Sequence, residues 1–174
     1  MFVLLKQSVF LEIVCKQLLF GVNALKTNHS KPIMSAPLNK TMNEQIQIIS
    51  TEWGLIFDPV SGFELNDHNI FSVIDFALDN CKEKKKSRLL FDETNIKRKL
   101  SCAKIIDAVE HFRRYSENSG VYRLAFVLQG NYDRTDLRFV ENVGYNRGIR
   151  IEHFYDKNKA IEWLKSKDIS PADK

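Results

Sequence analysis

Two short, uninterrupted apolar segments constrain the fold of this chain more than any other feature. RLLFDE at residues 88–93 and YRLAFVLQ at residues 122–129 are too short for core helices, and they have the composition of strands that are buried on both faces of a sheet. An amphipathic helical pattern follows each of them. Strands that alternate with helices in this way predict right-handed crossovers and a mainly parallel sheet.

The chain from residue 45 onward extends this pattern in both directions. QIQIIS and WGLIFDPVSG are β-rich, and the two residues between them suit an antiparallel hairpin, while IRIEHF alternates as an edge strand does. We therefore predict an α/β fold of order ββαβαβαβα, with a mixed, mainly parallel sheet and an N-terminal antiparallel hairpin. Capping residues and apolar spacing place its helices at about four positions: 68–82, 101–118, 133–143 and NKAIEWLKSK after Asp156.

The formal net charge of +4 belongs to one part of the chain. Residues 1–42 contain five lysines and one glutamate and so carry the whole surplus, which leaves the remainder balanced. A balanced domain weighs against nucleic-acid binding. Lys6, Glu12 and Lys16 interrupt the apolar start, so we expect no stable membrane insertion, and the pattern argues against a secretory signal.

The same charge and composition shift marks the domain boundaries. We expect residues 1–42 to be an N-terminal extension and linker, residues 43–168 to form the domain, and residues 169–174 to be a flexible tail. Translation that begins at Met34 or Met42 is one explanation of the extension. The alternative is an amphipathic helix that seeks a membrane surface.

The sequence has no recognisable motif for catalysis or metal binding. Its three cysteines lack C-x-x-C spacing, which argues against a disulfide framework and a zinc site and favours the cytoplasm, and its four histidines are scattered singly. Neither a glycine-rich phosphate loop nor a nucleophile signature is found. We therefore expect no cofactor, no metal and no enzymatic activity; an enzyme using Asp92 with Asp133 or Asp136 is a further alternative.

Polar residues follow the predicted strands at the edge where parallel sheets place their ligands. Asp92 and Glu93 are neighbours on a strand and point to opposite sides of it, and we interpret them as solvated loop acids. A phospho-accepting Asp92 would need a second acidic pair and a lysine after the last strand, and we assign neither. The candidate ligand crevice consists of Gln129, Gly130, Asn131 and Tyr155.

The segment FDETNIKRKLSCAKIIDAVEHF and the ending IRIEHFYDKNKAIEWL carry a resemblance to a known family. A strand that ends in Asp, a short loop and a serine at a helix start resemble STAS domains of the anti-sigma-factor-antagonist type. The likeness is closer to the SpoIIAA-like STAS proteins of bacteria and covers about residues 44–167. Residues 99–104 read KLSCAK where the STAS signature has D-S-S-G, so the glycine after the serine is missing.

The resemblance implies a regulatory domain that docks another protein, with a serine that can be phosphorylated. The candidate partner-binding or regulatory residues are then Asp92, Thr94, Lys97, Arg98, Lys99 and Ser101. Ser101 has two interpretations, as the cap of its helix and as a phosphosite beside the basic residues 97–99. The related CRAL-TRIO fold implies the alternative, a carrier with a pocket for a small lipid or metabolite between helices and sheet. The pattern leaves the oligomeric state open, with a dimer through the hairpin edge as one option.

Overall fold

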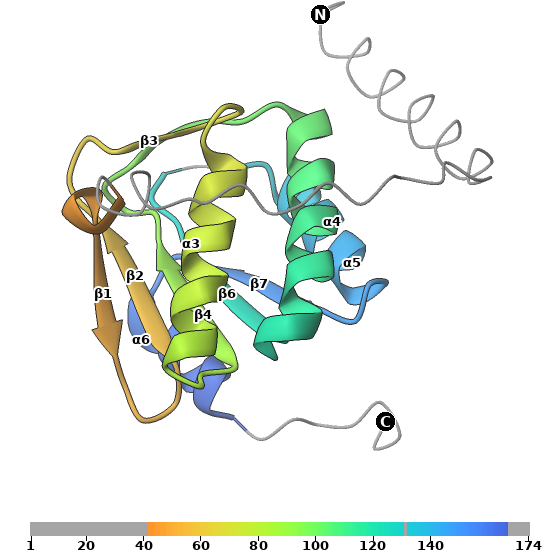
Figure 1. Ribbon diagram of the computed structural model, residues 1–174. Helices are drawn as coiled ribbons and strands as arrows, with labels where there is room; N and C mark the ends of the chain where they lie inside the picture. The colour runs from red at the N-terminus through yellow and green to blue at the C-terminus, as the bar shows by residue number, and fades with distance from the viewer. Residues whose placement is uncertain (1–41, 131, 167–174) are drawn as a thin grey trace, which may run out of the picture. The chain divides into compact units, whose positions relative to one another are not determined.

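The computed structural model describes residues 42–130 and 132–166, and its framework is a five-stranded sheet. The strand order is β1-β2-β4-β6-β7, in which β1 pairs antiparallel with β2 and every other pair is parallel (Figure 1). This confirms the predicted α/β fold with an N-terminal hairpin and a mainly parallel sheet. The strands are β1 (Ile46–Ser50), β2 (Leu55–Pro59), β4 (Arg88–Asp92), β6 (Arg123–Val127) and β7 (Arg150–Phe154).

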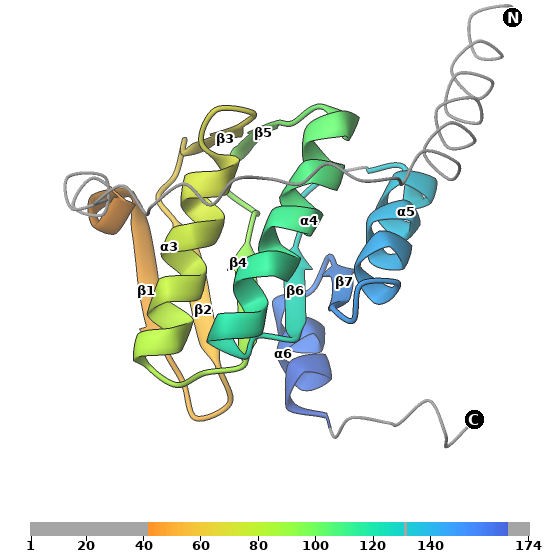
Figure 2. The same ribbon diagram turned by 45° about the vertical axis from the view of Figure 1, so that its right-hand side comes forward.

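Four long helices cover the two faces of this sheet unequally. Because the parallel strands follow one another in a single direction across the sheet, right-handed crossovers bring three helices to the same face. The fourth lies on the opposite face (Figure 2). The three helices are α3 (Ile70–Glu83), α4 (Cys102–Ser119) and α5 (Arg134–Tyr145), and the fourth is α6 (Lys157–Lys165), close to the predicted positions.

The two central strands are buried on both sides, as their composition predicts. Leu89 and Leu124 contribute to the larger core under α3 and α4, whereas Leu90 and Ala125 contribute to the smaller core under α6. All four side chains are 5% exposed or less, which explains why these strands contain no polar alternation. Met42, the last residue of the expected extension, is also buried in the larger core.

A second, two-stranded parallel sheet was not predicted. β3 (Glu64–Asn66) pairs with β5 (Lys97–Lys99), a triplet that we had interpreted as part of a polar loop. Lys97 and Lys99 point to solvent and Arg98 points inward, as the alternation of a strand requires. A strand of three charged residues has no apolar pattern, so only its pairing with a distant segment reveals it.

Arginines fasten α6 to the central strands. Arg88 Nη1 donates to the carbonyl oxygen of Leu164 at 2.6 Å, and Arg123 Nη1 donates to that of Ser166 at 2.8 Å. The guanidinium of Arg123 also lies 4.2 Å from the ring centre of Trp163. These cations satisfy carbonyl groups at the negative end of the helix dipole, where helices lack partners of their own.

Parts of the domain prediction lie outside the described residues, namely the extension before Met42 and the tail at 169–174. Within the described ranges, the structure contains no helix with the length and apolar character needed to span a membrane.

Candidate functional site at the carboxyl ends of the parallel strands

Asp92 ends strand β4 and faces the α6 side of the sheet. Its Oδ2 atom lies 2.8 Å from Lys157 Nζ, and its Oδ1 atom accepts hydrogen bonds from the Thr94 hydroxyl at 2.7 Å and the Thr94 N–H at 3.2 Å. Burial raises the pKa of Asp92, but the hydrogen bonds from Lys157 and Thr94 outweigh it and hold the pKa below its usual value. Asp92 is therefore a paired, largely buried carboxylate, and its interpretation as a solvated loop acid was wrong.

Lys157 is a residue that sequence reasoning missed. It stands at the start of α6, directly after the last strand, and it lies 4.0 Å from Asp58 on β2 as well as beside Asp92. A lysine after the last strand is thus present, contrary to our expectation. Its position in the sequence, three residues after β7, could have indicated that Lys157 lies near Asp92, since the carboxyl ends of parallel strands meet at one edge of a sheet.

Glu93 points to the opposite face, as expected for the neighbour of Asp92, but it too is buried. Its side chain is 1% exposed, and its Oε2 atom lies 3.3 Å from Nη1 of Arg98, whose side chain is 17% exposed. Burial raises the pKa of Glu93, and the charge and hydrogen bond of Arg98 oppose that rise without cancelling it. Arg98 therefore belongs to a buried ion pair with Glu93 and not to a basic cluster on the surface.

His153 adds a second buried titratable group to this face. Glu141 Oε1 accepts hydrogen bonds from the His153 ring Nδ1 at 2.9 Å and from its backbone N–H at 3.2 Å, and the ring stacks on Phe126. Burial lowers the pKa of His153, and Glu141 opposes this effect. The contact with Glu141 assigns the proton of the neutral ring to Nδ1 and leaves a lone pair on Nε2. Alternation along IRIEHF could have placed His153 on the same face as Ile151.

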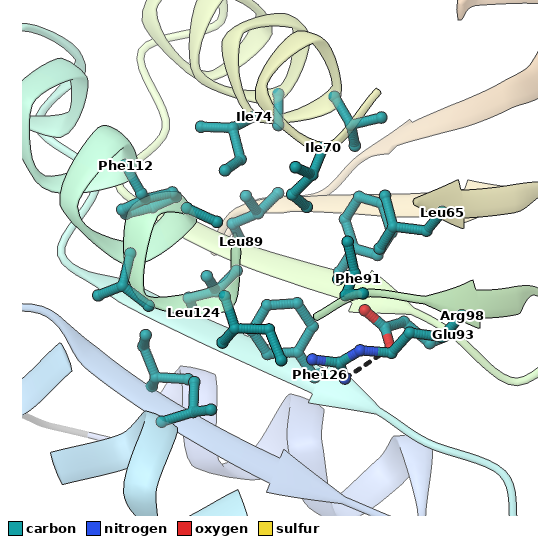
Figure 3. A pocket seen from close by; sticks show the side chains of 18 of the residues that line it. Leu65, Ile70, Ile74, Leu89, Phe91, Glu93, Arg98, Phe112, Leu124 and Phe126 are labelled. Carbon is teal, nitrogen blue, oxygen red and sulfur yellow. Dashed lines mark hydrogen bonds and ion pairs between the residues drawn. The ribbon is translucent and has the colours of Figure 1, made fainter. Parts of the chain in front are cut away.

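Glu93, Arg98 and His153 border an apolar cavity of about 80 Å³ between the sheet and the helices α3 and α4. Figure 3 shows Glu93 and Arg98 together at the edge of a group of apolar side chains. The apolar lining comes from α3, α4 and the central strands, and includes Ile70, Ile74, Leu89, Phe112, Leu124 and Phe126.

Ser101 is the N-cap of α4, as predicted. Its Oγ atom accepts from the Lys104 N–H at 3.3 Å and donates to Asp67 at 2.8 Å, while its own N–H donates to Asp67 at 2.9 Å. These bonds with Ser101 lower the pKa of Asp67. The charged side chain beside Ser101 is thus an anion, and the expected basic setting is altered because Arg98 pairs with Glu93 and Lys99 with Glu64.

The expected crevice residues do not meet this cavity. Gln129, Gly130 and Tyr155 are exposed, and none of them lines it; Asn131 lies outside the described residues. The order of the parallel strands does not reverse anywhere in the sheet, so the fold lacks the switch point at which such a crevice opens. The role of these residues in ligand binding stays a prediction.

Comparison with known proteins adds likenesses of fold. No family model matches the chain, and no curated protein matches it. An uncharacterised protein of the DUF3478 family with a SpoIIAA-like fold, from Shewanella loihica PV-4, is 21% identical over 68% of this chain and 91% of its own, with a TM-score of 0.43. The anti-sigma factor antagonist SpoIIAA in its unphosphorylated form is 13% identical over 70% of this chain and 99% of its own, with a TM-score of 0.44.

Proposed function

We propose that the protein is a cytoplasmic, non-enzymatic, STAS-like regulatory domain that docks another protein through residues 94–104. The observation that carries this proposal is the way this surface is held in place. β5 pairs with β3, and Asp67 holds both the backbone and the side chain of Ser101. A loop that is already ordered loses little conformational entropy on binding, which favours its use in recognition.

The exposed groups of this surface favour an acidic segment of the partner. Lys97 projects from β5 into solvent, Lys99 is exposed but paired with Glu64, and the first turn of α4 presents the small side chains of Cys102 and Ala103. The positive end of the α4 dipole lies at the same place. Charges of this kind steer association and set orientation more than they add affinity.

Phosphorylation of Ser101 would act on this surface by repulsion. A phosphate on Oγ would replace the hydrogen bond to Asp67 with a contact between two anions. The loop that carries Ser101 would then lose its tie to the segment that follows β3. We propose that the modified protein binds its partner more weakly.

Chemical cross-linking in the native host, followed by quantitative mass spectrometry, tests the docking surface. A partner that cross-links to residues 94–104 is then titrated against the purified full chain. We expect Lys97→Glu and Ser101→Asp to weaken that binding about tenfold, and Lys84→Glu, beyond the end of α3, to leave it unchanged. Ser101→Asn is the matched control, since asparagine caps a helix without adding charge. A partner that binds all four variants equally would refute the proposal.

A second candidate function is favoured by the cavity between the helices and the sheet. Its volume of about 80 Å³ is roughly half that of an engineered cavity that binds benzene, so it admits a small metabolite and not a lipid chain. Native mass spectrometry of the protein isolated from its host would detect a retained small molecule. A protein that is empty and stays empty when offered small apolar compounds would exclude this candidate.

A further inference from the structure

We propose that the cavity bordered by Glu93, Arg98 and His153 binds a small neutral hydroxyl compound, a short-chain alcohol, with its hydroxyl group at the Glu93 end. This inference rests on the second candidate function and names the chemical class of its ligand.

The lining of the cavity determines the apolar character and the size of the ligand. Apart from Glu93, Arg98 and His153, every residue that lines it is apolar, and the central ones such as Leu89 and Leu124 are 5% exposed or less. An apolar cavity accepts an apolar guest, and a volume of about 80 Å³ limits that guest to roughly three carbon atoms plus a head group. Longer chains would require α3 and α4 to separate.

Two acceptor atoms on nearly buried side chains determine the polar head group of the ligand. Within the described residues no hydrogen bond reaches Glu93 Oε1, and none reaches His153 Nε2, whose side chain is 2% exposed. Arg98 differs, because its side chain is 17% exposed and its remaining N–H groups can be solvated. This end of the cavity therefore offers two acceptor atoms that lack a donor, on side chains that are 1% and 2% exposed. A ligand that donates a hydrogen bond to one of them supplies the missing partner.

The charges around the acceptors favour a neutral donor. An anionic head would meet the Glu93 carboxylate and the lone pair of His153, and a cationic head would meet the Arg98 guanidinium. Burial also disfavours charge here, since it raises the pKa of Glu93 and lowers that of His153. A hydroxyl group can donate to Glu93 or His153 and accept from Arg98, so it matches all three side chains.

Methyl-region NMR of the full chain, titrated with three probes of equal size, tests the proposal. We expect 1-propanol to shift the methyl signals of Ile70 and Leu124 saturably at millimolar concentration, and at least tenfold more tightly than propionate or propylammonium. Tighter binding of either charged probe would overturn the assigned head group and leave the carrier function standing. If none of the three probes shifts these methyl groups, then water alone fills the cavity, and both the ligand class and the carrier function fail.

A variant identifies the acceptor. His153→Phe keeps the ring stacked on Phe126 but removes Nε2, and we expect it to reduce the preference for 1-propanol over propionate, with the Glu93 carboxylate accounting for what remains. His111→Phe is the matched control, because His111 stacks on Phe71 and does not line the cavity. Unchanged selectivity in a folded His153→Phe protein would refute the role of His153. If this variant does not fold, the ranking of the three probes on the wild-type chain still decides the proposal.

Discussion

Replacing Arg98 by methionine should destabilise the protein far more than replacing its partner Glu93 by glutamine. The asymmetry follows from exposure: the Glu93 side chain is 1% exposed and the Arg98 side chain is 17% exposed. Without Arg98, a carboxylate whose side chain is 1% exposed loses its ion-pair partner, which costs about 3 kcal/mol or more. Without the Glu93 charge, the guanidinium can turn outward and the glutamine can still accept a hydrogen bond, so the expected cost is about 1 kcal/mol.

Urea unfolding at pH 7, followed by tryptophan fluorescence, measures both free energies. The same measurement at lower pH tests whether the buried Glu93 charge causes the loss of stability. In Arg98→Met the native state holds a proton on Glu93 more tightly than the unfolded state does, because burial raises the native pKa. The variant's stability therefore falls as pH rises above the unfolded pKa of the carboxyl, and at pH 5 part of the loss should be recovered.

Two control proteins accompany this comparison. The double variant Glu93→Leu with Arg98→Met removes both charges, and it should be within about 1 kcal/mol of the wild type. Lys99→Met removes the exposed pair with Glu64 and should have no measurable effect. If Glu93→Gln proves as costly as Arg98→Met, the reasoning from burial is wrong.

Three further outcomes are expected. Gly54→Ala should lower the free energy of unfolding by about 2 kcal/mol or more, because a Cβ atom there would collide with the backbone carbonyl of Arg88. Urea titration measures this loss, and an unchanged unfolding midpoint would contradict the close packing at Gly54. Cys102 should be alkylated in the native protein and Cys81 only after unfolding, since Cys81 is buried and burial raises the pKa of its thiol to about 12. Peptide mass spectrometry measures the labelling of both cysteines, and labelling of Cys81 in the native protein would contradict its burial. Glu110→Gln should lower the melting temperature at pH 7, because three arginines, Arg113 foremost, lower the pKa of this carboxyl to about 2. The stabilisation by the Glu110 carboxylate is complete above about pH 4.5 and is lost as pH falls towards 2. The melting curves of the wild type and the variant should therefore converge near pH 2.

The main sheet and its helices could be predicted because their signals are local. Residues 88–93 and 122–129 bury side chains on both faces of the sheet, and an apolar run of strand length is enough to predict this. The cap of α4 was equally visible, since Ser101 precedes an amphipathic pattern. Wherever one segment determines its own environment, sequence reasoning gave the right structure.

The candidate site could be predicted only in part because its environment comes from distant segments. Asp92 and Glu93 were placed on opposite faces correctly, but their burial depends on Lys157 and Arg98, and no local pattern links these residues. The pairing of β5 with β3 is what turns Arg98 inward. The setting of Ser101 likewise depends on Asp67, which lies in the loop before α3.

The position of α6 at the end of the domain has a consequence for synthesis on the ribosome. This single helix covers the second face of the sheet, on which Ile56, Leu90 and Val127 are buried, and it follows every strand that the structure describes. Translation proceeds at about 5–20 residues per second, so the strands are complete before their cover emerges. For that interval the nascent chain presents an open apolar surface, which is the kind of surface that chaperones recognise and that drives aggregation. Arg88 and Arg123, which bind the end of α6, therefore complete the step that covers this apolar face and protects the new chain from aggregation.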